Sequence, residues 1–449
     1  MSPASAATAR PSRTSQWLVR RNRDFGRFWA GQTVSTFGDQ VTALALPTVA
    51  IVTLHASVFY VGLLAASSYL PYPVLGLFAG AWVDRRKRRN VLIAADAVRL
   101  GALAIIPLIA ALGSLNIWAL FGVGFLSGAA TCFFSAAYQS YLPSIAPERD
   151  IVVGNSLMEV SNSAAQVAGP SIAGALIGTI GSVSALLIDS ASYGVSVISL
   201  MLIRTAERPP ARPRRPLVAD VREGLSLVWG HRLVRQMAMT TALANIGRGL
   251  ALELFLLFAY RAIQQTPLVV GLLLAAGSVA SLAGAALSRK IAQAAGLGRT
   301  LLLAGAGKGL PWLLVPFALV APPVPVEVAV LVVSSFFIPV WNVNSVSLRQ
   351  YMTDRAVLAR VAATVRTATS SAVPLAGLLG GGLATAGSAL LGTRLGLAAV
   401  LALGGALWAA ATLALPLRGV WAIRDPDDAI SRYGRVSAAS SDHPQGESP

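Results

Sequence analysis

The chain alternates between long blocks of apolar residues and short polar or charged segments. Because a helix that crosses a bilayer needs about 20 apolar residues, these blocks predict membrane-spanning helices. Twelve spans are expected, at residues 30–54, 59–83, 91–112, 115–139, 153–179, 182–203, 235–260, 267–288, 300–321, 326–348, 360–386 and 391–416. We therefore expect an all-α membrane protein whose twelve transmembrane helices form two halves of six.

The longest connection between spans, at 204–234, divides them six and six. It begins with a Pro- and Arg-rich stretch, which is typical of an exposed linker. Val218, Val221, Leu225 and Val228 then share one helical face, which predicts a helix lying on the membrane surface. The expected order is a basic N-terminus at 1–29, a six-helix bundle at 30–203, this linker at 204–234, a second six-helix bundle at 235–416 and a largely disordered cytoplasmic tail at 417–449.

Basic residues gather on one side of the predicted topology. Of the 36 Arg and Lys residues, 30 fall in the termini and in alternate connections, whereas the other connections hold only Arg261 and Arg394. Cytoplasmic segments of membrane proteins carry this excess of positive charge. The pattern predicts a multi-pass protein of the inner (plasma) membrane with both termini in the cytoplasm.

Composition excludes several other classes of protein. Charged residues make up 12% of the chain, against about a quarter in soluble domains. The net charge of +17 lies in short connections rather than along one face, so it does not indicate a nucleic-acid partner. Cys132 is the single cysteine and the three histidines fall in loops or in the tail. These counts exclude a disulfide framework and a thiolate metal cluster, and we expect neither a metal nor a cofactor.

The two halves show signs of an internal repeat. Residues 80–86 match residues 284–290, and at the same offset Pro170 falls on Pro374, each in a Gly/Ala-rich stretch. Chance similarity between apolar, low-complexity spans is the alternative explanation. Parallel repeats of six spans are the arrangement of major facilitator transporters, which bind substrate between the halves near the midplane.

The connection between the second and third predicted spans carries a specific pattern. Residues 76–89, Gly-Leu-Phe-Ala-Gly-Ala-Trp-Val-Asp-Arg-Arg-Lys-Arg-Arg, resemble the signature of the major facilitator superfamily. The resemblance implies a cytoplasmic gate in which an acidic residue and a basic cluster contact neighbouring helix ends. The implied gate residues are Gly76, Gly80, Asp84, Arg85 and Arg88. In the second copy of the pattern Ser288 replaces the acidic residue, so we expect a weaker gate there.

Four further segments resemble the macrolide-efflux branch of the drug:proton antiporters, a branch that also contains siderophore exporters. These segments are residues 23–32, 35–39, 96–99 and 222–225. The resemblance implies a secondary active transporter that exports a hydrophobic or amphipathic drug or metabolite by proton antiport, with alternating access. One feature departs from the branch: the fourth span lacks the Arg that many drug antiporters carry at its middle. Coupling schemes that depend on that Arg do not apply to this chain.

Acidic side chains inside spans are costly to bury and are functional candidates by default. Asp39 lies about nine residues into the first span, roughly 14 Å deep at 1.5 Å per residue. The candidate proton-coupling residues are Asp39, Glu159, Asp189 and Glu253. Alternatively, each acid forms an ion pair with a base of another span, for which Arg248, Lys308 and Arg366 are available. Asp96 and Arg99 stand three apart on one helix face and can pair locally.

The fifth span resembles the Gly-Pro antiporter motif through Gly169, Pro170 and Gly174. A proline bends a helix and small residues permit close packing, so these residues are gating candidates. An ordinary membrane helix also tolerates them, which leaves a structural role open. Polar or amphipathic side chains that could line a substrate pocket are Gln32, Tyr69, Tyr138, Gln139, Asn162, Gln166, Trp341 and Asn342.

No pattern in the chain indicates catalysis or nucleotide binding. Residues 305–309 resemble a phosphate-binding loop superficially, but they lack its first glycine and its Ser or Thr. We therefore expect an ion gradient to drive transport, in a monomer whose partners are protons, a small-molecule substrate and the lipid bilayer. Two alternatives with the same fold stay open: an exporter of a siderophore or self-made metabolite, and an uncoupled facilitator or importer. A membrane-embedded lipid enzyme or sensor would need a reactive set of residues, which we do not find.

Overall fold

The structure, a computed structural model, describes residues 18–19, 21–83, 85–205, 207, 217–354, 357–413 and 423–436. The regular elements of these ranges are all helices, and eleven of the membrane-sized helical segments are long and apolar enough to cross a bilayer. The all-α membrane fold predicted from the apolar blocks is therefore confirmed.

The N-terminal half begins with α2, which continues into a short π-helix, η1. Its helices are α2 (Arg23–Thr48), η1 (Val49–Thr53), α3 (Val58–Tyr69), α4 (Pro71–Val83), α5 (Arg88–Ala111), α6 (Ile117–Ile145), α7 (Glu148–Ile180) and α8 (Ser182–Met201). The α2–η1 segment is the expected first span, but it is not among the eleven because polar residues such as Gln32, Asp39 and Gln40 lower its hydropathy. It nevertheless packs along α7 and α8 inside the half.

The C-terminal half follows a helix that lies outside the bundle, α9 (Leu217–Gly230). Its helices are α10 (Arg232–Leu257), η2 (Phe258–Ala262), α11 (Pro267–Ala295), α12 (Leu297–Gly309), η3 (Leu310–Leu319), α13 (Pro323–Met352), α14 (Leu358–Ser370), α15 (Ala372–Leu391) and α16 (Thr393–Leu413). The short helix α18 (Pro426–Tyr433) comes last.

Two expected spans divide into two α-helices, and a third ends in a 3₁₀-helix. The second divides into α3 and α4 before Pro71, and the eleventh divides into α14 and α15 at Ser371. The ninth changes from α-helix to the 3₁₀-helix η3, which contains Pro311 and Pro316. Proline has no backbone N–H and cannot continue the i→i−4 ladder, which accounts for the breaks at the prolines.

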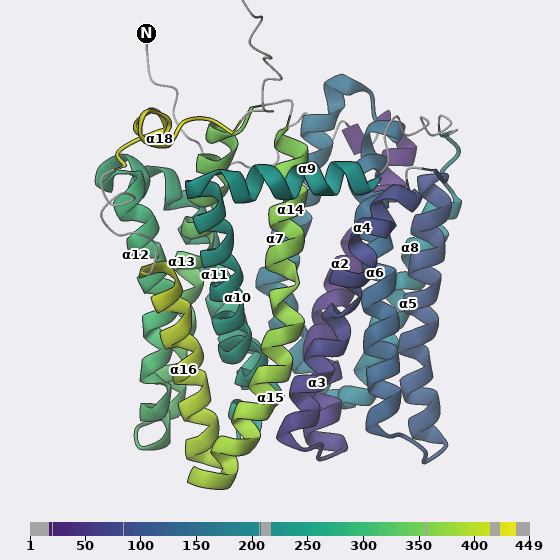
Figure 1. The fold of residues 1–449 in the computed structure, drawn as a ribbon. Helices are drawn as coiled ribbons and strands as arrows, with labels where there is room; N and C mark the ends of the chain where they lie inside the picture. Colours follow the sequence, from purple (N-terminus) through teal and green to yellow (C-terminus); the bar gives the residue numbers. More distant parts are fainter. Residues whose placement is uncertain are drawn as a thin grey trace, which may run out of the picture.

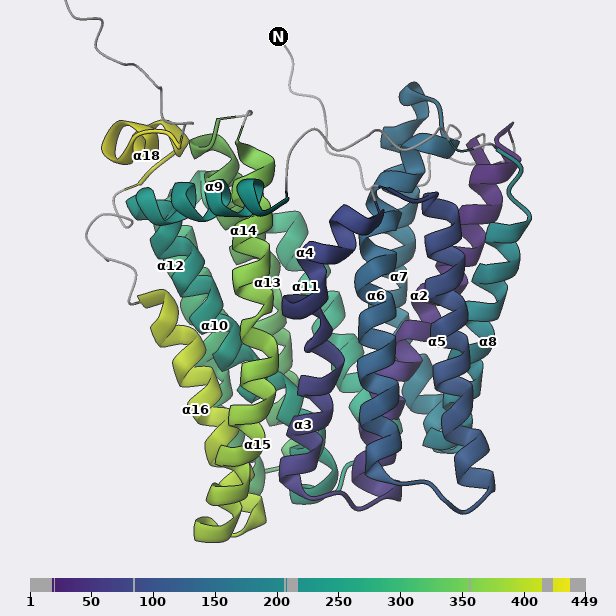
Figure 2. The same ribbon diagram turned by 45° about the vertical axis from the view of Figure 1, so that its right-hand side comes forward.

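The spans stand side by side in two groups. Figure 1 shows α5, α6 and α8 on one side of the molecule and α12, α13 and α16 on the other. Helix α9 lies across one end of the spans, and α18 lies at that same end in both views (Figures 1 and 2). We call this the α9 end, and the opposite one the far end. Val228 of α9 is buried against Val234 of α10 and Val361 of α14, which holds α9 on the C-terminal half.

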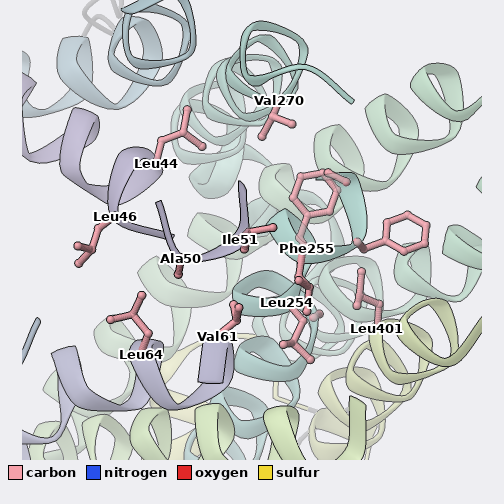
Figure 3. Close-up of a cluster of buried hydrophobic side chains, with 14 of the residues drawn as sticks. Leu44, Leu46, Ala50, Ile51, Val61, Leu64, Leu254, Phe255, Val270 and Leu401 are labelled. Atoms are coloured by element: carbon pink, nitrogen blue, oxygen red, sulfur yellow. The ribbon is translucent and has the colours of Figure 1, made fainter. Parts of the chain in front are cut away.

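The two halves share an apolar core towards the far end. Ile51 and Val61 of the N-terminal half lie in the same buried cluster as Leu254 and Phe255 of the C-terminal half (Figure 3). Glycines let the backbones approach closely there: a Cβ added at Gly62 would lie 2.5 Å from the carbonyl oxygen of Gly377. The halves are therefore in direct contact at the far end.

Part of the C-terminal tail, expected to be largely disordered, is ordered. Residues 423–436 form α18 and its flanks, with Ile423 and Ala429 buried. The backbone amide of Leu297 donates to the carbonyl of Arg424, and that of Val436 donates to Met352. Composition alone missed this segment because its few apolar residues pack against helices that are distant in the sequence.

Candidate functional site

A polar cavity of about 780 Å³ lies within the N-terminal half. We call it cavity A; it is lined by α2, α5, α6 and α7. The sequence-predicted residues that line it are Gln32, Asp39, Tyr138, Glu159 and Asn162. Its wall is rich in hydroxyl and amide groups, and Phe134 and Met158 supply apolar surface. Such a mixture suits an amphipathic small molecule.

A second cavity, of about 390 Å³, lies further along α2, towards the C-terminal end of that helix. We call it cavity B; its walls come from α2, α3, α4, α6 and α8, and one residue, Glu253 of α10, comes from the C-terminal half. Tyr69 lines it, as does Asp39. Asp39 therefore belongs to the walls of both cavities, together with Thr131.

A hydrogen-bonded network surrounds Asp39. Tyr193 of α8 donates to Asp39 Oδ1, and the Tyr193 ring lies 4.4 Å from the guanidinium carbon of Arg99. Arg99 forms a buried ion pair with Asp96, as the spacing of these residues predicts, and Ser196 donates to the other Asp96 oxygen. The network connects a cavity-lining carboxyl to a buried ion pair on a neighbouring helix.

The other predicted proton-coupling acids occupy three different environments. Glu159 is exposed in cavity A, and no ion pair of it occurs among the described residues. Glu253 lies 3.9 Å from Arg248 on its own helix. Asp189 is fully buried outside both cavities, where it accepts a hydrogen bond from Ser192. Its second oxygen has no hydrogen-bond partner among the described residues.

The remaining substrate-pocket candidates are not brought together with these cavities. Gln166 and Asn342 are exposed and stand outside the residues that line either cavity. Trp341 is buried beneath Lys308, whose ammonium nitrogen lies 3.8 Å from the ring centroid. The backbone of Gln139 lies in α6, but its side chain is outside the described set.

The gate predicted between α4 and α5 is described in part. Asp84 lies outside the described residues, and of Gly80 only the position in α4 is known. Gly76 faces Cys132, and Arg85 is exposed.

Arg88 begins α5, and its backbone amide donates to Glu207 at 2.8 Å. Its guanidinium lies 3.7 Å from the same carboxylate. The basic turn is thus attached to the segment that follows α8.

The predicted gating residues of α7 lie at two contacts. A Cβ added at Gly169 would lie 2.4 Å from Gln40 of α2, within the N-terminal half. One added at Gly174 would lie 2.5 Å from the carbonyl oxygen of Pro267, across the interface between the halves. The carbonyl of Pro170 packs in the same way against Gly271. These contacts require residues without a side chain.

Three residues that make polar contacts in the structure were not predicted from the sequence. The sequence does not indicate Tyr193, because a tyrosine in an apolar span carries no signal of its hydrogen-bond partner. Glu207 lies in the linker. Glu327 lies near the start of α13, where it is buried and accepts a hydrogen bond from Gln265 at 3.4 Å. Glu327 lies at the edge of a predicted span and Glu207 lies in the predicted linker, so their closeness to the membrane edge is the signal that could have indicated them.

Comparison with known proteins agrees with the sequence resemblance. The sequence model of the Major Facilitator Superfamily matches residues 28–381. The multidrug efflux pump Tap of Mycobacterium tuberculosis is 28% identical over 260 residues, which are 55% of this chain and 61% of the pump. The chain thus spans about three fifths of the length of that relative.

Two further relatives are also named as efflux proteins. Tap of Mycolicibacterium fortuitum is 25% identical over 366 residues, which are 78% of this chain and 86% of that protein. Macrolide efflux protein A of Streptococcus pyogenes is 24% identical over 181 residues, which are 40% and 44% of the two chains. The predicted resemblance to the drug-efflux branch is confirmed.

Solved structures show the same fold at low sequence identity. The nucleoside transporter NupG superposes with a TM-score of 0.70 at 11% identity, over 87% of this chain and 98% of that one. A bacterial homologue of the iron transporter ferroportin superposes with a TM-score of 0.68 at 15% identity, over 87% and 98% of the two chains. At these identities the likeness establishes the fold and no more.

Proposed function

Because the chain belongs to the Major Facilitator Superfamily, we propose that it exports a hydrophobic or amphipathic drug or metabolite in exchange for protons. It is a membrane transporter and not an enzyme. We further propose that it acts as a monomer in the bacterial inner membrane with both termini in the cytoplasm, as the distribution of Arg and Lys favours.

The placement of Asp39 is the observation that carries this proposal. Its carboxyl lies inside the predicted first span, lines both cavities and accepts a hydrogen bond from Tyr193. A carboxyl in this position can hold either a proton or a positively charged group of a substrate, but not both at once. Competition of this kind couples two opposite fluxes. Asp39 is thus the proposed coupling residue.

The other acids support different parts of the cycle. Glu159 faces cavity A and Glu253 faces cavity B from the other half, so both can exchange protons with water in the cavities. Asp189 is fully buried beside α2, where a Cβ added at Gly38 would lie 2.2 Å from its carboxyl. We assign Asp189 a secondary role in proton binding, by its closeness to the helix that carries Asp39.

The contacts at the far end support alternating access. Transport of this kind requires the halves to separate at one end while they close at the other. The halves touch at the far end through the shared apolar cluster and through Gly62, Gly174 and Gly271. We interpret this arrangement as the state closed to the outside, with Gly174 and Pro170 among the residues that seal it.

Lumenal pH in proteoliposomes under an imposed proton gradient tests the proposal. A macrolide, a tetracycline and a catecholate siderophore are added in turn to vesicles that hold the purified protein. We expect one of them to trigger proton flux with the native chain and none with Asp39→Asn. The exposed carboxyl variant Asp427→Asn is the matched control and should behave as the native protein.

The outcomes also separate the alternatives. Flux with the siderophore alone would favour a siderophore exporter, which shares this fold. Transport of a labelled substrate without proton flux would identify an uncoupled facilitator and would overturn the antiport proposal. Normal proton-driven export by Asp39→Asn would remove Asp39 from the mechanism.

A further inference from the structure

An arginine of one half contacts the backbone of the other at the far end. Arg261 of η2 donates a hydrogen bond to the carbonyl oxygen of Ala56 at 2.6 Å and a longer one to that of Ile51 at 3.4 Å. Ile51 belongs to η1 and Ala56 follows it. The contact therefore joins the end of the first span to the end of the seventh.

The local backbone explains why these carbonyls accept a charge. The last carbonyl groups of a helix lack partners within the helix and carry partial negative charge. The chain turns sharply after η1, where His55 has φ 48° and the amide of Ala56 bonds back to Ala50 at 2.9 Å. The carbonyl of Ala56, which follows this turn, accepts from Arg261, and a guanidinium is a suitable donor for it.

The same turn occurs after η2 in the other half. Gln264 has φ 55°, and the amide of Gln265 bonds back to the carbonyl of Ala259 at 2.8 Å. The two ends thus form a structurally repeated pair. An arginine is present in η2 alone, since η1 has the sequence Val-Ala-Ile-Val-Thr. Only the C-terminal half therefore contributes an arginine to this contact between the halves.

Arg261 is itself half-buried, and the residues around its contact are buried. Ile51 and Ala56 are buried, as are Phe258 and Ala262 on either side of the arginine. An ion pair between Arg261 and an acidic residue does not occur in the described part of the chain. A hydrogen bond from a charged donor contributes more than one between neutral groups.

A neighbouring hydrogen bond crosses the same boundary. Thr48 of α2 donates to the hydroxyl of Tyr260 at 3.1 Å, next to Arg261 in sequence. Both contacts exist only while the ends of the first and seventh spans remain together. Separation of the halves at this end must break them and expose the guanidinium and the carbonyls to water.

We propose that Arg261 is a positioning residue that holds the far end of the transporter closed by binding the backbone carbonyls of Ala56 and Ile51. This inference rests on the alternating access put forward under the proposed function. Loss of the arginine shifts the resting population towards the state that is open at the far end, without removing any group from cavity A or cavity B.

Distances between spin labels at the far end test this inference. Labels on cysteines that replace Ser114 and Ala321, both exposed and in different halves, report the separation of the halves. The chain has one native cysteine, so Cys132→Ser provides the background. The protein is measured in lipid nanodiscs with no substrate and no gradient.

We expect Arg261→Ala to add a population with a longer distance, with the ratio of open to closed molecules raised about tenfold. Arg261→Lys, which keeps the charge on a different donor geometry, should give an intermediate ratio. Arg394→Ala removes the other arginine predicted for this side and is the matched control, with an unchanged distribution.

The same distance distribution in Arg261→Ala and in the native chain would overturn the inference. Should Arg261→Ala fail to fold, Arg261→Gln carries the test, because it keeps a polar donor and loses the charge. The readout does not depend on transport. If Arg261→Ala shows the longer distance but the native chain shows no proton flux with any substrate, the antiport proposal is rejected and the role of Arg261 is kept.

Discussion

Tyr193 donates a 2.5 Å hydrogen bond to Asp39 and stacks its ring against Arg99, so one side chain links the shared wall of two cavities to a buried ion pair. The three residues come from α8, α2 and α5. A change in the charge of Asp39 therefore alters the hydrogen bond to Tyr193, whose ring contacts Arg99.

Removing the Tyr193 hydroxyl should impair coupling while the fold is kept. We expect Tyr193→Phe to lower proton-driven export about tenfold, because a hydrogen bond to a charged group contributes roughly 1.5–3 kcal/mol. Substrate binding in the absence of a gradient should change little. Tyr60→Phe is the control, since Tyr60 lines neither cavity and contacts the rings of Trp118 and Phe121. Equal export by the two variants would argue against a role for the hydroxyl.

The Asp96–Arg99 ion pair should behave as a unit in stability measurements. Arg99→Met leaves the Asp96 carboxylate buried without its partner, and we expect this to cost about 3–5 kcal/mol. The double variant Asp96→Asn with Arg99→Met should recover much of that loss, since no uncompensated charge remains. Thermal unfolding in a mild detergent gives the comparison. A double variant less stable than either single one would contradict this interpretation.

A methyl group at Gly174 should disturb the contact between α7 and α11. The added Cβ would lie 2.5 Å from the carbonyl oxygen of Pro267, which is too close for any real contact. Overpacking of this kind costs roughly 1–3 kcal/mol, so Gly174→Ala should open the far end and slow export. Gly178 lies one turn further along the same helix and has nothing within 4 Å. Gly178→Ala should therefore leave export and the distance between the halves unchanged.

The contact between Asp24 of α2 and the start of the linker should weaken in acid. Burial opposes the charge of Asp24, but hydrogen bonds from Thr205, Arg204 and Arg27 outweigh it and hold the pKa of this carboxyl below its usual value of 3.8. The folded state lowers the pKa of Asp24. The hydrogen bonds from the linker to this carboxylate therefore contribute fully above about pH 3.8, and their contribution is lost as the pH falls through the lowered pKa.

Hydrogen exchange at the Thr205 amide measures this attachment. Protection should be constant near neutral pH and should fall in strong acid. Asp24→Asn should show weaker protection at pH 7 and a flatter dependence on pH. A native chain whose protection does not change on acidification would count against the role of Asp24.

Much of the architecture could be predicted from local patterns. Runs of about 20 apolar residues predict spans because a bilayer imposes that length on any helix. Asp96 and Arg99 could be paired in advance because a spacing of three on one helix determines that their side chains meet. The polar first span also followed from the sequence, although its residues lower its hydropathy.

The candidate site depended on contacts between residues far apart in the chain. Nothing near Tyr193 in the sequence indicates Asp39, and nothing near Trp341 indicates that Lys308 covers it. The sequence therefore placed Trp341 among pocket candidates, whereas the structure buries it.

By itself, then, the sequence determined the class of protein, the spans and the acids that lie within them, since these depend on hydropathy and on spacing along one helix. Only the tertiary structure decided which acid lines both cavities, that Arg261 binds the carbonyl of Ala56, and that residues 423–436 are ordered. The physical reason is that such contacts form when helices pack side by side, and packing sets the rotation of each helix. A rotation of one residue turns a side chain by about 100°, enough to move it from a cavity to the lipid.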